Sequence, residues 1–148
     1  MFLAAARRRC GVVIRSYSHF LPAKVMGVLL VTSNKIRQLL CVSYIGRVRP
    51  EEFPRNREDL TVQLEELSAG FRLLADFSQL ESMGLDCEPE LGRTMELIGK
   101  AGVELVVRVF PDPSKDIGMN ILTVFHYPHR PRVVTCDNLV DAAMALGL

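Results

Sequence analysis

The residues best suited to chemistry lie between positions 76 and 88, where a buried-strand pattern runs into a polar turn just before a helix. A hydroxyl at a helix N-terminus can carry a phosphate, because free backbone N–H groups and the helix dipole stabilise the added charge. An open α/β sheet also collects functional groups at the carboxyl ends of its strands. The carboxylates and hydroxyls of this segment are Asp76, Ser78, Glu81, Ser82, Asp86 and Glu88.

Ser82 is the candidate phosphorylation site of this segment, and Ser78 is a weaker one. Three carboxylates flank Ser82 closely in sequence, and their like charge disfavours an added phosphate. The favoured interpretation is a turn serine whose hydroxyl bonds to its own backbone.

A second candidate is a ligand or enzyme site at the sheet edge, formed by Asp76, Cys87 and His126. A helix N-terminus lowers the pKa of a thiol, so Cys87 could be a nucleophile there. A nucleophile needs a nearby base held by a third group, and no motif links Cys87 to His126 or His129. We therefore expect Cys87 to be inert and partly buried. For Asp76, a structural role in holding the following turn is at least as well supported as a role in a functional site.

Other chemistries have little support in the sequence. His126 and His129 flank a proline and lack a carboxylate that would complete a metal site. The four cysteines contain no C-x-x-C pair, which favours reduced thiols over a zinc site or a disulfide framework. No glycine-rich phosphate loop and no aromatic–basic platform for nucleic acid is present, so we expect no cofactor and no nucleic-acid partner. A basic cluster is interleaved with acids and is expected to be self-paired: Arg47, Arg49, Arg55 and Arg57.

Charge divides the 148 residues unequally, although length and composition predict one globular domain. Residues 1–50 carry nine Lys or Arg and no acid. Residues 51–148 carry the other nine basic residues and all 17 acids, which gives them a net charge of −8. The overall charge of +1 therefore says little about partners.

Residues 1–25 are interpreted as an N-terminal extension that precedes a domain at 26–148. They are Arg-rich and free of acids, which is typical of a mitochondrial transit peptide. Alternatively, translation begins at Met26 and the extension reflects a misplaced gene start, which is the favoured view. The apolar run at 25–31 is far shorter than the ~20 residues of a membrane helix. We expect a cytoplasmic protein, or one in the mitochondrial matrix if residues 1–17 are a transit peptide.

Hydrophobic periodicity predicts an α/β domain with two opening strands followed by alternating helices and strands. The opening pair is expected to form an antiparallel hairpin and the later strands to pair in parallel, giving a mixed sheet of about five strands with helices packed against it. The predicted strands are residues 27–32, 36–48, 71–77, 103–110 and 132–135. The predicted helices are residues 55–68, 86–100 and 115–126, and a last one capped by Asp137 or Asn138 that buries Leu139, Ala142, Ala143 and Leu146.

This order of elements, together with the turn Glu81-Ser82-Met83-Gly84, resembles the STAS-like domains (sulphate transporter and anti-sigma-factor antagonist), in their single-domain, sporulation antagonist-like branch. The resemblance covers residues 26–148. Better-known members carry an Asp-Ser-Ser/Thr-Gly turn there, and a partner kinase phosphorylates its second hydroxyl. Met83 stands at that position here and cannot accept a phosphoryl group.

The resemblance implies a surface around this turn that binds another protein. Its residues would be the carboxylates and hydroxyls Asp76, Ser78, Glu81, Ser82, Asp86 and Glu88. With no catalytic set in view, we expect a non-enzymatic, regulatory interaction module that lacks the usual phosphoacceptor. The alternative is the small-molecule or enzyme site at Asp76, Cys87 and His126. A third hypothesis is a homodimer that uses the opening hairpin as an exposed edge.

Overall fold

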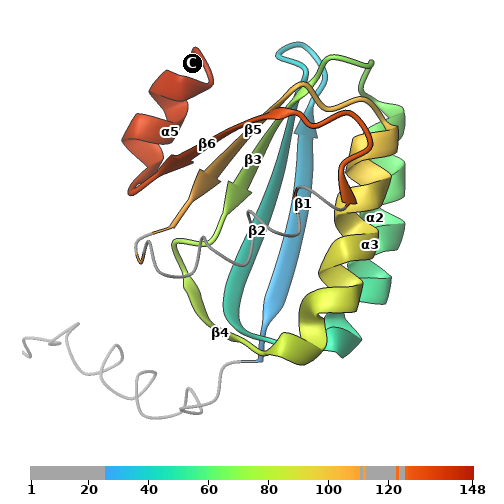
Figure 1. Cartoon of the computed structure of the whole chain (residues 1–148), viewed down its shortest axis with the longest axis vertical. Coiled ribbons are helices and arrows are strands. Elements are labelled where there is room, and N and C mark those ends of the chain that lie inside the picture. The colour runs from blue at the N-terminus through green and yellow to red at the C-terminus, as the bar shows by residue number, and fades with distance from the viewer. Residues whose placement is uncertain (1–25, 111, 113–122, 124–125) are drawn as a thin grey trace, which may run out of the picture.

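The computed structural model describes residues 26–110, 112, 123 and 126–148. In this part of the chain six strands form one sheet, and helices pack against both of its faces (Figure 1). The strands are β1 (Val28–Asn34), β2 (Leu39–Val48), β3 (Arg72–Asp76), β4 (Leu80–Met83), β5 (Leu105–Val109) and β6 (Arg132–Cys136). The α-helices are α2 (Phe53–Glu65), α3 (Glu88–Lys100) and α5 (Leu139–Ala145), and the short 3-10 turns are η1 (Pro50–Glu52) and η2 (Leu85–Cys87).

The opening hairpin is confirmed as antiparallel, with Leu30 opposite Ser43. A polar turn joins its strands, and the Asn34 side chain accepts a hydrogen bond from the Arg37 N–H at 3.0 Å. The remaining strands pair in parallel in the order β2-β3-β5-β6, as strand–helix alternation requires. β1 therefore lies at one edge of the sheet and β6 at the other.

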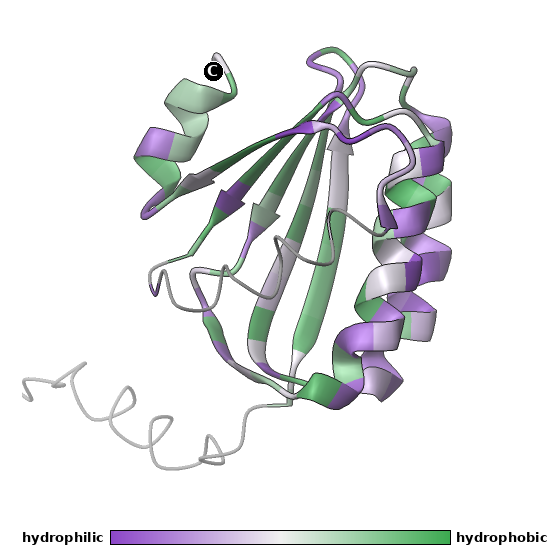
Figure 2. Cartoon of the chain, viewed as in Figure 1, coloured by the Kyte–Doolittle hydropathy of each residue, from purple (hydrophilic) through white to green (hydrophobic). Residues whose placement is uncertain are grey.

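Helices α2 and α3 cover one face of the sheet, whereas α5 covers only part of the other (Figure 1). α3 buries a stripe at i, i+4 and i+7, made by Leu91, Met95 and Ile98. The hydrophobic strands lie between the helix layers, and the polar faces of α2 and α3 turn outward (Figure 2). An ion pair between Arg57 on α2 and Glu90 on α3 joins the two helices.

The main core fills the space between the sheet and these two helices. Its centre is an aromatic stack in which the Phe77 ring lies parallel to Tyr44 at 4.4 Å and to Phe110 at 4.3 Å between ring centroids. A smaller core under α5 forms on the opposite face, where Ala142 and Leu146 pack on β5.

Several details differ from the sequence prediction, including the next three. The segment 80–83, predicted as part of a turn, is strand β4, which brings the sheet to six strands. α2 begins at Phe53 rather than near Arg55, because Pro54 is accommodated in the first helical turn. Leu139 is exposed, although Ala142 and Leu146 are buried as predicted. The helix predicted at 115–126 lies almost wholly outside the described residues.

Asn138 is confirmed as the cap of α5, where its side chain accepts a hydrogen bond from the Asp141 N–H at 2.8 Å. Among the described residues, no helix is long and apolar enough to cross a membrane.

Candidate functional site

Strand β4 carries the candidate residues beside the C-terminal end of β2. β2 pairs with β3 through its first half and with β4 through its last three residues. β2 changes partner between Ser43, the last residue that pairs with β3, and Gly46, the first that pairs with β4. The register then shifts between Gly46 and Arg47, and Gly46 has a φ of 72° and donates its N–H to the Gln79 carbonyl at 2.9 Å. Glycine adopts this left-handed conformation without steric cost, and such bulges redirect a strand. The segment is therefore extended, because its backbone pairs with β2.

Glu81 is held by an ion pair across these two strands. Its Oε1 atom lies 3.0 Å from both Nε and Nη2 of Arg47. Both side chains are about half exposed, so solvent screens the pair and its contribution to stability is small. Arg47 and Arg57 of the basic cluster are thus ion-paired, but their partners are Glu81 of β4 and Glu90 of α3 rather than the acids interleaved with the cluster.

Ser82 is exposed and lies opposite Arg47 in the register of β4 with β2. It therefore sits within a strand, and not at the helix N-terminus that the phosphosite hypothesis assumed. α3 begins six residues later, at Glu88. The N-terminal dipole of α3 acts mainly within its first turn, so it gives little help to a phosphate on Ser82.

Met83 turns in the opposite sense and packs against the main core. It is half-buried and pairs with Val48 at the end of β2. A thioether has no hydroxyl to receive a phosphoryl group, and this side chain fills apolar space instead. The position that the resemblance assigns to the phosphoacceptor is thus a packing position in this chain.

The chain then passes through Gly84 and η2 to the start of α3, and three side chains along this path are exposed. Leu85 is 89% exposed, and Asp86 and Glu88 are exposed carboxylates on either side of the buried Cys87. Sequence reasoning did not single out Leu85, although an apolar residue between a glycine and an acid is an available signal. We call the following residues the acidic turn surface: Glu81, Ser82, Leu85, Asp86 and Glu88.

Cys87 is buried directly beneath this surface, with 1% of its area exposed. Its Sγ atom lies 3.5 Å from the Val48 carbonyl oxygen. Burial raises the pKa of the thiol to about 11, and the negative charges of Asp86, Glu52 and Glu51 add to that rise. The helix N-terminus is outweighed by these effects, so the expected inert cysteine is favoured over a nucleophile.

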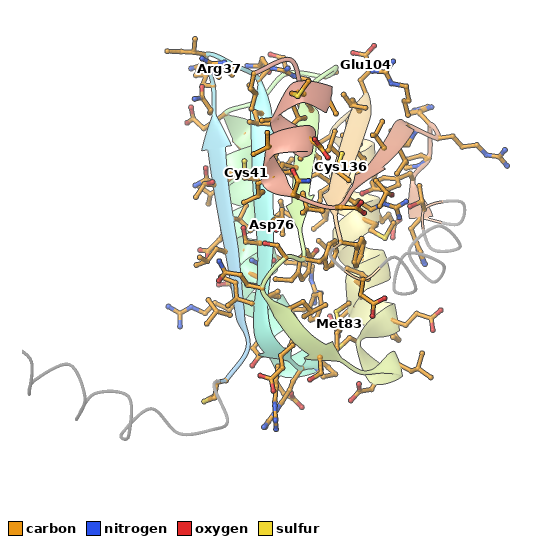
Figure 3. All side chains as sticks on the ribbon, turned by 90° about the vertical axis from the view of Figure 1, so that its left-hand side faces the viewer. Arg37, Cys41, Asp76, Met83, Glu104 and Cys136 are labelled. Atoms are coloured by element: carbon orange, nitrogen blue, oxygen red, sulfur yellow. The ribbon has the colours of Figure 1, made fainter. Side chains whose placement is uncertain are left out.

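Asp76 ends β3, where its Oδ1 accepts a hydrogen bond from the Ser78 N–H at 2.9 Å. This contact holds the turn that leads into β4. Asp76 points to the same face of the sheet as Cys41, which is the face away from α2 and α3 (Figure 3). Burial raises the pKa of Cys41, a hydrogen bond with Thr32 opposes this, and the Asp76 charge adds to the rise.

The structure does not bring Asp76, Cys87 and His126 into one site. Cys87 belongs to the core on the helix side, whereas Asp76 faces the other side of the sheet. The His126 ring lies against α3, so close to Gly92 that a Cβ there would stand 2.7 Å from Nε2. Within the described ranges, no group of three or more His, Cys, Asp or Glu could hold a metal ion.

Arg108 is a buried polar residue that sequence reasoning missed. It sits in the middle of β5 with 2% of its area exposed, and its Nη2 lies 3.4 Å from the Thr135 Oγ1. Near it, burial raises the pKa values of Tyr44 and Tyr127, and the Arg108 charge lowers that of Tyr127. These side chains line a cavity of about 20 Å³, which is room for about one water molecule. The single arginine within an apolar strand pattern was the available signal.

Comparisons with known proteins bear on the fold. No family model matches the sequence, and no curated protein matches it significantly. Among solved structures, the chain is similar to an uncharacterized protein of the DUF3478 family with a SpoIIAA-like fold from Shewanella loihica PV-4. The TM-score is 0.60 at 15% identity, over 81% of this chain and 93% of that chain.

It is also similar to an anti-sigma factor antagonist from Mycobacterium paratuberculosis. That match has a TM-score of 0.52 at 21% identity and covers 82% of this chain and 95% of that chain. At these identities the likeness concerns the fold. The mixed sheet, its strand order and both structural matches agree with the fold that the resemblance implied, and the chain therefore has a SpoIIAA-like, or STAS-like, fold.

Proposed function

We propose that this protein is a non-enzymatic, regulatory interaction module that binds another protein through the acidic turn surface and carries no phosphoacceptor at the usual position. The observation that carries the proposal is the contrast between neighbours on β4. Ser82 is exposed, whereas Met83 packs into the core. A surface with this arrangement offers charge and an exposed leucine to a partner, but no hydroxyl at the expected place.

The charges of this surface support a basic partner. Asp86 and Glu88 are exposed and follow one another closely, and Glu81 is only partly neutralised by Arg47. Leu85 adds an apolar contact at the centre of these acids. Interfaces commonly combine a small apolar anchor with a charged rim, where the charges mainly set specificity and association rate.

The solved protein from Mycobacterium paratuberculosis gives the proposal its direction, because that protein is an anti-sigma factor antagonist. For the present chain we infer only the class of activity, which is reversible binding of a regulatory protein. The buried Cys87 thiol, with its raised pKa, offers no nucleophile to an enzymatic alternative at the same surface.

The test is affinity capture from the native source with three full-length baits, read by quantitative mass spectrometry. A partner bound by the wild type should be lost with the double variant Glu81→Lys, Glu88→Lys. It should remain with Glu58→Lys, Glu65→Lys, which makes the same charge change on exposed positions of α2. Equal binding to all three baits would refute the acidic turn surface.

Intact mass measurement of the protein from its native source tests the missing switch. We expect an unphosphorylated protein across growth conditions. Phosphate on Ser82 or Ser78 would overturn the claim that the switch is absent and would assign it to a displaced hydroxyl.

A further inference from the structure

Within the described part of the chain, β1 is an edge strand whose outer side has no partner strand. Among the described strands, β1 pairs only with β2, so alternate N–H and C=O groups along its outer side have no strand partner. Proteins protect such edges with charged residues or proline. β1 has the sequence VLLVTSN, which contains neither, and Val28 and Leu30 are 41% and 50% exposed.

A groove of about 410 Å³ runs beside this edge, between the start of β1 and the beginning of α2. Its strand side is formed by residues 27–30, and its helix side carries three carboxylates and one guanidinium. The groove therefore has a local charge of −2. The charged lining residues are Glu51, Glu52, Arg55 and Asp59.

Asn56 also lines the groove, and its side chain is buried to all but 3%. Its Nδ2 group has no hydrogen-bond acceptor among the described residues. Buried amide donors in native proteins are nearly always paired, so this one points to an acceptor that a ligand supplies. A main-chain carbonyl oxygen has the right chemistry.

We propose that this groove binds an extended segment of a partner protein, which adds to β1 as a further strand and alternates basic with β-branched apolar residues. Successive side chains of an added strand point to opposite faces of the sheet. One set would lie on the helix side, against the carboxylates of the groove. The other set would lie on the open face beside Val28 and Leu30, which are exposed there.

This site is separate from the acidic turn surface and does not depend on the function proposed for it. β1 and β4 lie on opposite sides of β2, and the two sites share no residue. Charge reversal at Glu81 and Glu88 should leave the groove intact, so the two proposals can fail independently.

The first experiment measures fluorescence anisotropy of a labelled peptide of alternating Lys and Val, titrated with the full chain at low salt. Two further peptides carry N-methyl groups, one on every Lys and the other on every Val. Only one set of N–H groups faces β1 in an added strand, so one methylated peptide should lose binding and the other should keep it. Strand addition would be overturned if both methylated peptides bound. It would also be overturned if none of the three peptides bound.

The second experiment tests the charge of the groove with variants of the full chain. Glu51→Lys, Asp59→Lys should weaken binding of the unmodified peptide about tenfold, since exposed charge pairs each contribute a few-fold. The matched variant Glu58→Lys, Glu65→Lys changes the same charge on α2 outside the groove and should change binding less than about twofold. Equal weakening by both would indicate nonspecific attraction and refute the site. Hydrogen exchange should show new protection within residues 28–34 when the peptide is bound, and its absence would also refute the site.

Discussion

The covered face of the sheet and the acidic turn surface both depend on strand β2, but the first is buried and the second is exposed to solvent. The first half of β2 pairs with β3 and sends Leu40 and Val42 into a core where almost no surface remains exposed. The last three residues pair with β4, which presents Glu81 and Ser82 to solvent. The bulge at Gly46 separates these two behaviours. Stability should therefore depend on the first region, and recognition on the second.

The largest loss of stability is expected from a substitution in the aromatic stack of the covered face. Phe77→Ala removes the ring between Tyr44 and Phe110 at a site that is 2% exposed. We expect a loss of about 3–5 kcal/mol in the free energy of unfolding, because both the transfer of the ring and the cavity left behind count against the folded state. Urea unfolding followed by circular dichroism measures it.

A matched control for that variant is Leu30→Ala, which truncates a half-exposed side chain of β1. It should cost about 1 kcal/mol or less. A larger loss at Leu30 than at Phe77 would reverse the comparison and show that the open edge, and not the covered core, holds the sheet together.

A second effect is expected where the chain enters β1. A Cβ on Gly27 would lie 2.3 Å from the Arg47 carbonyl oxygen and 2.6 Å from the Val48 Cα, both of which are backbone atoms. Gly27→Ala should therefore force the backbone apart and cost about 1–3 kcal/mol. Thermal unfolding of the variant is the measurement.

Gly84→Ala gives the corresponding control within the acidic turn surface. Its Cβ would meet the Oδ1 of Asp86, which is the end of an exposed and flexible side chain. That side chain can rotate away, so the cost should stay below about 0.5 kcal/mol. Comparable losses at both glycines would show that the turn is as tightly packed as the entry to β1.

The element order could be predicted from the sequence because it follows from hydrophobic periodicity. Alternation in β2 and the i, i+4, i+7 stripe of α3 each specify an element and its buried face. β4 could not be predicted in this way. It has four residues, two of them polar and exposed, and it is a strand only because β2 extends past the bulge at Gly46 to pair with it.

The candidate site was predicted in part. The segment 81–84 and the Met83 thioether within it were visible in the residues, and a partly buried Cys87 was expected, but the packing of Met83 against the core depends on tertiary structure. The groove beside β1 was missed for the same reason. Asn56 lies on the buried side of a helix whose other inward residues are apolar, and only the fold shows what faces it.

Cys87 tests the boundary between the core and the acidic turn surface. Its folded-state pKa of about 11 lies above the 9.0 of an unperturbed thiol. The neutral thiol is thus favoured by folding, and its contribution to stability is complete below pH 9 and is lost as the pH rises through about 11. The destabilisation caused by Cys87→Ala should shrink between pH 8 and pH 10.5 in urea titrations.

Alkylation gives an independent check on the same residue. At pH 8, iodoacetamide should modify Cys87 more slowly than the half-buried Cys136 in the folded protein, and at similar rates in urea. Peptide mass spectrometry measures both rates. Faster reaction at Cys87 would mean that the turn opens readily and that Cys87 is not a stable part of the core.

The smallest effect is expected from the Arg47–Glu81 pair on the acidic turn surface. Both side chains are about half exposed at a separation of 3.0 Å, so solvent and salt screen their attraction. A double-mutant cycle with Arg47→Gln and Glu81→Gln should give a coupling energy between about 0.2 and 1 kcal/mol that falls as salt is added. A coupling well above that range would mean that β4 is fastened to β2 by charge, and the acidic turn surface would then contribute to stability as the covered face does. A small coupling leaves Glu81 free to exchange Arg47 for a partner's cation at little cost to the fold.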